Sequence, residues 1–530
     1  MTLHGKSLIA GQPGEAGGAR FRARNPATGA SLEPEFHEAL AAEAARAVDA
    51  AEDAFTEYRR LPAEARARFL DSIAAEIEAL GDTLIERTTL ETGLPAARIV
   101  GERGRTCAQL RLFAATVREG SWVDARIDTA LPERTPAPRP DIRRMLKPIG
   151  PVVVFGASNF PLAFSTAGGD TASAFAAGCP VVVKAHPAHP GSGELVAGAI
   201  IRAAANCGLP PGVFSFVHGG PETGAALVRH PGTAAVGFTG SHAAGRALFD
   251  VASSRPHPIP VFAEMSSVNP VFVLPGALKE RGGAIAQGLF SSFTLGVGQF
   301  CTKPGLVFIP RGADADAFVE ELARIVREAA GGTMLTAGIL EAFERGREQM
   351  TGIEGVKVIA AAAGAPAEGS SAAPSVAWTD ATNFLARPSL ANEVFGPFTL
   401  VVGCENTDEM LRCVTSLGGQ LTATLHATDA DLAAAGTLLE AAERCAGRVI
   451  INGFPTGVEV SPAMHHGGPY PATTDVRFTS VGTAAILRFA RPVCYQGFAD
   501  DLLPPELKDA NPCRILRTVN GELTRDAVRR

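Results

Sequence analysis

The sequence predicts an α/β protein with two parallel-sheet domains and a small bridging arm. From Ile149 onward, short β-branched runs alternate with Ala- and Gly-rich stretches of helical length, and a second block of this kind starts near Val271. Strands that alternate with helices form right-handed crossovers, which build mostly parallel sheets. A proline-dense, charged stretch, residues 129–148, precedes the first block. A chain of 530 residues has room for about three domains.

Residues 1–125 are predicted to be mostly helical. The clearest helix spans residues 61–80, where Pro62 stands in the first turn, a position that tolerates proline. Gly81 can adopt the left-handed conformation that ends a helix. Apolar residues recur on one face of this segment, at Phe69, Ile73, Ile77 and Leu80.

After residue 149 the pattern predicts alternating elements. In the first block, strands are expected at Pro151–Phe155, Val181–Val183, Val213–Val217 and Ala235–Phe238, with helices at 162–178 and 192–206. In the second block, strands are expected at Val271–Leu274, Leu306–Ile309, Thr399–Val402, Leu421–Leu425 and Val449–Ile451. Residues 361–377, rich in Ala, Gly, Ser and Pro, are interpreted as a surface loop. The tail after Ala490 is interpreted as irregular packing or interface material.

These patterns divide the chain into three parts. Residues 1–128 and 149–265 are assigned to a dinucleotide-binding domain, because alternating strands and helices are the format of nucleotide-binding α/β domains. Residues 266–465 are assigned to a second α/β domain, and residues 129–148 and 466–530 to a bridging region.

The composition excludes several classes of partner and location. With a formal charge of −7, the chain has no basic surplus for binding nucleic acid or an anionic membrane. Nine cysteines without a CxxC pair argue against a disulfide framework or a zinc ribbon. No secretory signal or membrane-spanning apolar stretch is found, so we expect a cytoplasmic protein with reduced thiols.

Cys301 is a candidate nucleophile. It stands in Gly298-Gln299-Phe300-Cys301-Thr302, after a predicted helix and among small residues. A cysteine nucleophile needs steric access and a positive neighbour that favours the thiolate. A buried, unreactive thiol is the commoner case among nine cysteines, so this pattern alone leaves both interpretations open.

Two more residues suit carbonyl chemistry. Glu264 ends an apolar strand in Phe262-Ala263-Glu264, and an apolar setting raises the pKa of a carboxylate toward the range of a general base. Asn159 follows a strand in a tight turn, where its neutral amide can donate to an oxyanion. Alternatively, Glu264 is a surface residue and Asn159 merely caps a helix.

Two segments are candidate contacts for a cofactor. Gly240-Ser241 leads through Gly245 into a helix whose N-terminal amides can hold a pyrophosphate, although the GxGxxG signature is absent. Glu393, in Asn392-Glu393-Val394-Phe395-Gly396-Pro397, can accept hydrogen bonds from a ribose diol or cap a turn.

His465-His466 has no Asp, Glu or Cys at ligand spacing, so no metal site is predicted. Four phenylalanines are either core residues or the lining of a substrate tunnel, namely Phe160, Phe164, Phe300 and Phe454.

The order of these candidate motifs along the chain resembles that of the NAD(P)-dependent aldehyde dehydrogenase superfamily. Asn159, Lys184, Gly240-Ser241, Glu264, Cys301 and Glu393–Pro397 follow the family's order, and the likeness covers residues 25–490. Within the superfamily, Val154–Leu162, Lys184–Pro190 and Arg491–Gln496 are similar to the α-ketoglutaric semialdehyde (2,5-dioxopentanoate) dehydrogenases, and less so to NADP-dependent fatty aldehyde dehydrogenases. In place of the family's common Leu-Gly-Gly, this chain has Met265-Ser266-Ser267.

The resemblance implies a role for each residue. Cys301 attacks an aldehyde, Asn159 holds the oxyanion, and Glu264 activates the water that hydrolyses the thioester. Family members that transfer the acyl group to coenzyme A lack this carboxylate, so Glu264 argues for a free acid as product. Lys184, Gly240, Ser241, Gly245, Glu393 and Phe395 bind the cofactor. Residues 266–465 become the catalytic domain, and the bridging region pairs subunits of a homo-oligomer, a dimer or a tetramer.

The resemblance also bears on the choice of cofactor. NAD-preferring members carry a Glu three residues after the lysine, where this chain has Pro187. Because position 187 carries no carboxylate, nothing there repels the 2′-phosphate of NADP, and Lys184 and His186 attract it. We therefore expect NADP to be preferred and NAD to be accepted.

Two alternatives of other classes stay open. One is a catalytically silent binding protein on the same fold, against which the presence of all four residues Cys301, Glu264, Asn159 and Lys184 argues. The other is a cysteine hydrolase that pairs Cys301 with a histidine and cleaves esters without a nicotinamide cofactor. That alternative gives no function to the predicted dinucleotide-binding domain.

Overall fold

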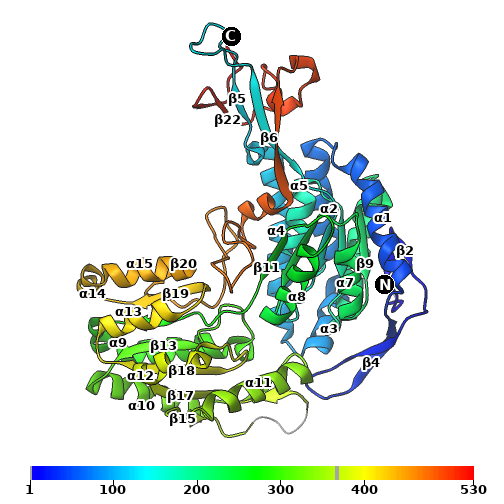
Figure 1. The fold of residues 1–530 in the computed structure, drawn as a ribbon. Coiled ribbons are helices and arrows are strands. Elements are labelled where there is room, and N and C mark those ends of the chain that lie inside the picture. Colours follow the sequence, from blue (N-terminus) through cyan, green and yellow to red (C-terminus); the bar gives the residue numbers. More distant parts are fainter. Residues whose placement is uncertain (1–2, 365–368, 530) are drawn as a thin grey trace.

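The chain folds into two α/β lobes and an arm that projects from the first lobe (Figure 1). This computed structural model describes residues 3–364 and 369–529. The segment of residues 452–482, which has little regular structure, runs between the two lobes (orange in Figure 1). Within the described residues, no helix combines the length and the apolar character that crossing a bilayer requires.

The first lobe is built on a seven-stranded sheet with the order β11-β10-β7-β8-β9-β1-β2. Strands β7 to β11 are parallel, and β1 adds to the edge antiparallel. The strands are β1 (Leu8–Ile9), β2 (Gln12–Pro13), β7 (Val152–Phe155), β8 (Val181–Lys184), β9 (Phe214–Val217), β10 (Ala235–Thr239) and β11 (Val261–Glu264). The helices are α1 (Ala41–Tyr58), α2 (Ala63–Ala79), α3 (Gly81–Thr92), α4 (Ala96–Glu119), α5 (Gly169–Ala177), α6 (Pro190–Asn206), α7 (Pro221–Arg229) and α8 (His242–Ser253).

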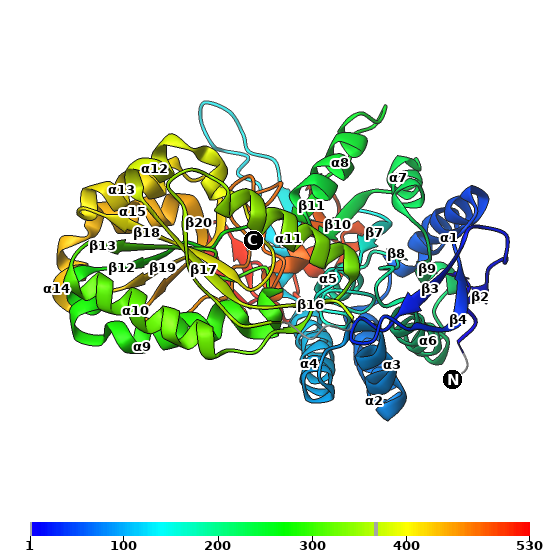
Figure 2. The same ribbon diagram turned by 90° about the horizontal axis from the view of Figure 1, so that it is seen from below.

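Helices cover both faces of this sheet, which explains why its parallel strands are mostly apolar. Successive residues of a strand point to opposite faces. On β7, Val153 and Phe155 belong to the core under α1, α7 and α8, whereas Val152 and Val154 belong to the core under α2, α4 and α6. Figure 2 shows these two sets of helices on opposite sides of the strands. Parallel strands covered on both faces are expected to be continuous hydrophobic runs.

The second lobe repeats the plan with the strand order β15-β17-β18-β13-β12-β19-β20, in which only β15 is antiparallel. Helices α9 and α10 pack on one face and α12, α13 and α15 on the other. Its strands are β12 (Val271–Val273), β13 (Leu306–Pro310), β15 (Lys357–Ala361), β17 (Ser375–Asp380), β18 (Phe398–Cys404), β19 (Gln420–His426) and β20 (Ala446–Ile451). Its helices are α9 (Pro275–Thr294), α10 (Ala313–Glu328), α11 (Ala337–Thr351), α12 (Ala381–Ala386), α13 (Thr407–Ser416), α14 (Asp429–Ala434) and α15 (Gly436–Cys445).

The arm is a five-stranded sheet that joins distant parts of the chain. The strand order is β21-β6-β5-β22-β23, and β6 pairs with β21 along its whole length, from Pro148 opposite Ala490 to Ile142 opposite Gln496. Its strands are β5 (Arg126–Asp128), β6 (Ile142–Pro148), β21 (Ala490–Gln496), β22 (Arg517–Val519) and β23 (Glu522–Thr524). Just before β21, Ala485, Ile486 and Phe489 pack in the core of the first lobe. The assignment of domains and of a subunit-pairing role stays a prediction.

The structure confirms the predicted strands of both blocks and differs in four segments. Residues 162–168 form turns before α5 and not the start of the predicted helix, and Glu102 accepts hydrogen bonds from the Leu162 and Ala163 N–H groups of this segment. Residues 375–377, predicted as loop, start the buried strand β17; residues 365–368 of that predicted loop lie outside the described residues. The tail after Ala490 begins with the regular strand β21, not with irregular structure. The N-terminal part contains two unpredicted hairpins, β1–β2 and the pair β3 (Arg20–Arg24) and β4 (Ser31–His37).

The topology of the first sheet locates its binding edge. Strands β7, β8 and β9 follow one another in one direction, whereas β10 and β11 lie on the other side of β7. The strand order therefore reverses between β7 and β10. In open α/β sheets, ligands bind at the carboxyl ends of the strands beside such a switch point. Asn159, Lys184, Gly240 and Glu264 all stand at or just after those carboxyl ends.

Candidate active site

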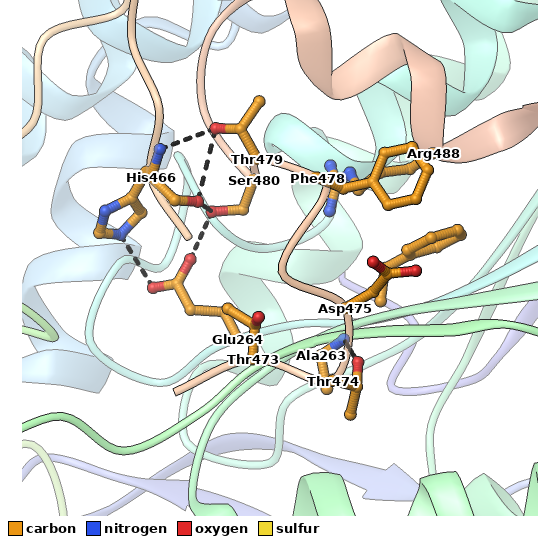
Figure 3. A pocket seen from close by; sticks show the side chains of 11 residues that line it. Ala263, Glu264, His466, Thr473, Thr474, Asp475, Phe478, Thr479, Ser480 and Arg488 are labelled. Carbon is orange, nitrogen blue, oxygen red and sulfur yellow. Dashed lines mark hydrogen bonds and ion pairs between the residues drawn. The ribbon is translucent and has the colours of Figure 1, made fainter. Parts of the chain in front are cut away.

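Three reactive side chains meet between the lobes. The Nε2 atom of His466 lies 2.9 Å from Oε1 of Glu264 and 3.5 Å from Sγ of Cys301. The ligand atoms of the three residues lie within 4.8 Å of one another. Ser480 donates a hydrogen bond to Oε2 of Glu264 and thereby holds its other oxygen (Figure 3). The cluster thus joins a thiol, an imidazole and a carboxylate that come from three separate segments.

The loop that carries Cys301 is held in an unusual backbone conformation. Gly296, Val297 and Gly298 all have positive φ values, of 58°, 58° and 67°. For the β-branched Val297 this conformation is strained, and such strain persists only where the surroundings enforce it. A Cβ atom on Gly298 would lie 2.3 Å from the Gly396 carbonyl, so the cysteine loop packs directly on the turn that follows Glu393.

Asn159 lies beside this loop, as its predicted role requires. Its Nδ2 donates to the Gln299 carbonyl at 3.0 Å, two residues before Cys301. Glu102 is buried and fixes the backbone that follows Asn159 through the two hydrogen bonds, each 2.9 Å, from Leu162 and Ala163. The structure therefore brings Asn159, Glu264 and Cys301 into one site.

The expected direction of the Glu264 pKa is wrong. Glu264 is buried, and burial by itself raises its pKa, but the interaction with His466 and the hydrogen bonds from His466, Ser480 and Cys301 together hold the pKa below the ordinary value. The carboxylate is therefore ionised at neutral pH and able to accept a proton.

The cysteine also differs from expectation, because no positive neighbour dominates its surroundings. Burial, followed by the charge and hydrogen bond of Glu264 and the charge of Glu393, raises the pKa of the Cys301 thiol well above its ordinary value. Arg448 opposes this shift only weakly. The resting group is therefore the neutral thiol, whose proton must pass to a neighbouring base when sulfur attacks.

This raised pKa makes a prediction for alkylation of Cys301 in the free enzyme. The rate with iodoacetamide should be slow at neutral pH and should rise about tenfold per pH unit to beyond the ordinary thiol range, because only the thiolate reacts. Glu264→Gln should shift this profile toward lower pH, since it removes a charge that raises the thiol pKa. Mass spectrometry of the Cys301 peptide over a pH series measures both profiles. A plateau already reached at neutral pH would contradict the raised pKa.

Sequence reasoning missed His466 as a partner of Cys301 and Glu264. Sequence spacing offers His466 no Asp, Glu or Cys partner, but the structure places Cys301 and Glu264 beside it, although they lie 165 and 202 positions away in the chain. Thr479 accepts a hydrogen bond from the His466 N–H at 2.8 Å and so fixes its backbone. The prediction that the site binds no metal stays a prediction.

The predicted cofactor residues line the edge beside the switch point. Ser241 caps α8 by accepting a hydrogen bond from the Ala244 N–H at 3.3 Å. A Cβ on Gly240 would lie 2.6 Å from the Phe238 ring, and one on Gly245 would lie 2.7 Å from Sδ of Met265. These glycines keep the start of α8 open and close to the sheet, an arrangement that fits a pyrophosphate at a helix N-terminus.

Lys184 places a positively charged side chain at this edge of the first sheet. It ends β8, and burial lowers its pKa to about 8, opposed by the charge of Glu38. The expectation that His186 attracts a phosphate by charge is wrong, because burial and then the nearby His189 and Lys184 lower the His186 pKa well below its ordinary value. The His186 and His189 rings instead stack, with centroids 5.2 Å apart.

Glu393 lies nearer to Cys301 than its place in the sequence suggests. It receives hydrogen bonds from Ser266 and from the Ser267 backbone, which belong to the unusual Met-Ser-Ser segment. Burial raises the Glu393 pKa, opposed by Lys303. Lys303 is buried and donates to the carbonyls of Val394, at 3.0 Å, and Phe398, at 2.9 Å, so it holds the Glu393–Pro397 turn, which includes Phe395, against the cysteine loop.

Three of the four candidate tunnel phenylalanines form one cluster. Phe160 lies 5.2 Å from Phe164 and 5.1 Å from Phe300, measured between ring centroids. Because Phe160 follows Asn159 and Phe300 precedes Cys301, this cluster adjoins the reactive groups. Phe454 does not join it, since its ring packs against His426 with centroids 4.8 Å apart.

Comparisons with known proteins agree with this site. Residues 14–470 match the model of the aldehyde dehydrogenase family. The chain is 52% identical over 524 residues to alpha-ketoglutaric semialdehyde dehydrogenase 2 of Azospirillum brasilense, covering 98% of this chain and 100% of that protein. It is 49% identical over 524 residues to alpha-ketoglutaric semialdehyde dehydrogenase of Acinetobacter baylyi, covering 99% of each chain.

Solved structures share the fold at lower identity. The γ-glutamyl-γ-aminobutyraldehyde dehydrogenase of Burkholderia cenocepacia superposes with a TM-score of 0.80 at 23% identity, covering 94% of this chain and 97% of that chain. A Cys-to-Ala variant of aldehyde dehydrogenase C from Pseudomonas syringae, in complex with NAD+ and octanal, superposes with a TM-score of 0.78 at 22% identity, covering 93% and 97%.

Proposed function

Because the chain belongs to the aldehyde dehydrogenase family and is an NAD(P)-dependent oxidoreductase that converts aldehydes to acids, we propose that its substrate is 2,5-dioxopentanoate and its product 2-oxoglutarate. The observation that carries this proposal is the identity of 52% and 49% to two α-ketoglutaric semialdehyde dehydrogenases over nearly the whole chain.

In the proposed mechanism Cys301 is the nucleophile. Its sulfur bonds to the aldehyde carbon, and its proton passes to the cluster of Glu264 and His466, whose nearest atom lies 3.5 Å from the sulfur. Asn159 Nδ2 and the Cys301 backbone N–H donate to the oxyanion that forms. The nicotinamide, when bound, supplies the hydride acceptor that turns the thiohemiacetal into a thioester. Glu264 then takes a proton from water, which attacks the thioester; the carbon–sulfur bond breaks and the thiol is reprotonated.

A substrate panel tests the proposed function. Initial rates with 2,5-dioxopentanoate, shorter and longer semialdehydes and n-alkanals should show the highest kcat/KM for 2,5-dioxopentanoate, with NADP and with NAD. Product formation should not depend on coenzyme A. A higher kcat/KM for long n-alkanals would replace the proposed substrate by a fatty aldehyde.

We propose further that NADP is preferred over NAD. Lys184 supports this preference, because it stands where a 2′-phosphate binds in the family and position 187 is a proline. Glu38 interacts with Lys184 and is the opposing charge. The affinity for NADP should therefore rise in Glu38→Gln and fall in Lys184→Met.

The pH dependence of cofactor binding gives a direct test. Since the Lys184 pKa is about 8, the lysine loses its charge as the pH rises through that value. The Kd for NADP should increase above pH 8 by about tenfold, whereas the Kd for NAD should change much less. Fluorescence titration of wild type, Lys184→Met and the exposed control Lys279→Met measures this difference. Equal pH dependence for both cofactors would contradict the role of Lys184.

The hydrolase alternative gains one observation, because His466 Nε2 lies 3.5 Å from Cys301 Sγ. The same Nε2 atom lies 2.9 Å from Glu264, however, so the carboxylate does not hold the other ring nitrogen as in a Ser-His-Asp triad. We propose ester cleavage as a side activity of the same cysteine. We also propose that the protein is a cytoplasmic homo-oligomer. The arm supports this proposal, because it ends in strands β21 and β23, which leave backbone groups at both edges of its sheet.

A further inference from the structure

Two arginines of α4 border the phenylalanine cluster of Phe160, Phe164 and Phe300. Arg98 and Arg105 are seven residues apart and so lie on one face of the helix. The Arg98 guanidinium lies 4.6 Å from the Phe160 centroid and 4.9 Å from the Phe300 centroid. The Arg105 guanidinium lies 5.7 Å from the Phe164 centroid. This face of α4 therefore contacts the phenylalanines that precede Cys301 and follow Asn159 in the chain.

The two guanidinium groups differ in their partners. Arg98 donates to the buried Glu102 at 3.4 Å and lies against both the Phe160 and the Phe300 rings. Arg105 donates from Nη1 to the Val458 carbonyl at 2.7 Å, whereas its Nε and Nη2 are buried without a hydrogen-bond partner in the described part of the chain. Buried donors of a charged group are normally satisfied, so a free pair calls for a ligand.

The Nε and Nη2 atoms of Arg105 form the side of the guanidinium that can bind a carboxylate. The Nε–H and one Nη2–H group of a guanidinium point the same way and bind the two oxygens of a carboxylate in a bidentate pair. Arg105 is also close enough to Cys301 to interact with its thiolate electrostatically. Arg448 shares that proximity, but two of its nitrogens donate to the Pro455 and Gly457 carbonyls.

We propose that Arg105 binds the carboxylate of the substrate through Nε and Nη2 while the aldehyde at the other end of the substrate meets Cys301. This inference rests on the proposed function, because it takes the substrate to be an aldehyde that carries a carboxylate. The Val458 carbonyl orients the guanidinium, and the neighbouring phenylalanines exclude water from the pair. Arg105 thereby selects an acidic aldehyde over a neutral one of the same length.

A comparison of two substrates tests the inference. Arg105→Met should lower kcat/KM for 2,5-dioxopentanoate about 100-fold or more, mainly through KM, because a bidentate charged contact is lost. The same variant should keep kcat/KM for n-pentanal within about threefold of wild type, since that substrate never made the contact. Arg105→Lys should recover part of the loss. Arg103→Met is the matched control on α4, because Arg103 donates instead to the Gly81 carbonyl at 3.0 Å. An equal loss with both substrates, or no loss with either, would overturn the inference.

A second readout does not depend on the identity of the substrate. 5-Iodopentanoate carries a carboxylate as far from its reactive carbon as in 2,5-dioxopentanoate, 5-iodopentanamide carries none, and both alkylate the Cys301 thiolate. The ratio of their rates should fall about tenfold or more in Arg105→Met, while changes in thiol pKa cancel in the ratio. If wild type does not prefer 2,5-dioxopentanoate but this ratio falls, the proposed substrate is wrong and the anion-binding role of Arg105 stands. If wild type prefers 2,5-dioxopentanoate and the ratio and substrate preference both persist in Arg105→Met, the substrate stands and the role of Arg105 is wrong.

Discussion

Replacing Cys301 by alanine is expected to lower kcat/KM for aldehyde oxidation by at least about 10⁴-fold. The loss is this large because the thiol creates the species that gives up hydride: without a covalent bond to sulfur, the aldehyde carbon carries no oxyanion that can expel hydride. Asn159 and the cofactor edge remain in the variant, but they have no tetrahedral intermediate to stabilise. Absorbance of the reduced nicotinamide, recorded with 2,5-dioxopentanoate, measures the effect.

The control for this variant must separate the nucleophile from thiols in general. Cys207 is partly buried near the C-terminal end of α6, outside the cluster, so Cys207→Ala should retain wild-type rates. NADP affinity measured by fluorescence should be unchanged in Cys301→Ala, which shows that the fold and the cofactor edge are intact. Aldehyde oxidation by Cys301→Ala within about tenfold of the wild-type rate would rule out the covalent mechanism.

The sequence predicts the buried parallel strands well because their physical signal is local. A strand covered on both faces, such as β7 or β12, is apolar at every position, and a run of β-branched and aromatic residues in the sequence reflects that burial. Strand β17 lacks this signal at its start, where Ser375 follows a stretch rich in Ala, Gly, Ser and Pro. It is buried because Val376 and Ala377 pair with β18, and because Gly403 leaves space for the Trp378 ring, 2.3 Å from where a Cβ would lie. Those contacts are non-local and cannot be seen in the sequence of β17.

The candidate site shows the same division. Cys301, Glu264 and Asn159 stand in motifs whose order along the chain can be recognised. The topology of the first sheet brings Glu264 and Asn159 to one edge, and Cys301 reaches them from the loop before β13 of the second lobe. His466 could not be assigned, although His465-His466-Gly467-Gly468 was noticed, because its partners are contributed by β11 and by the loop before β13. Arg105 carries no motif at all. Its proposed role depends on two nitrogen atoms that have no hydrogen-bond partner within residues 3–364 and 369–529, a property that exists only in the folded chain.

The sequence could not predict the directions in which the pKa values of Glu264 and Cys301 shift, because these directions also depend on contacts between residues that are distant in the chain. The apolar run before Glu264 correctly indicates burial, and burial does raise a carboxylate pKa. The hydrogen bonds of His466 and Ser480 reverse that effect, however, and both residues come from the segment that returns between the lobes. The ionised Glu264 in turn keeps Cys301 as a thiol. The ionised Glu264 carboxylate is therefore already in place to accept the proton that the Cys301 thiol releases when its sulfur attacks.

Replacing Glu264 by glutamine should separate the two halves of the reaction. The amide keeps the size of the side chain but cannot accept a proton from water, so hydrolysis of the thioester should slow about 10²–10⁴-fold. Acylation also loses a proton acceptor, but removal of the negative charge lowers the thiol pKa, so the first turnover should be affected less. Stopped-flow mixing with excess aldehyde should show a burst of reduced nicotinamide close to one per active site, followed by a slow steady state.

The intermediate that accumulates in Glu264→Gln can be identified directly. Intact-protein mass spectrometry after the burst should show the mass of an acyl group on Cys301, and hydroxylamine should release it, because it attacks thioesters without a general base. The exposed residue Glu280 on α9 gives the matched control, and Glu280→Gln should show neither a burst nor an adduct. A fall in burst rate equal to the fall in steady-state rate, with no adduct, would mean that Glu264 serves acylation alone. His466 would then be the group left to activate water, since its Nε2 lies 3.5 Å from the sulfur that holds the acyl group.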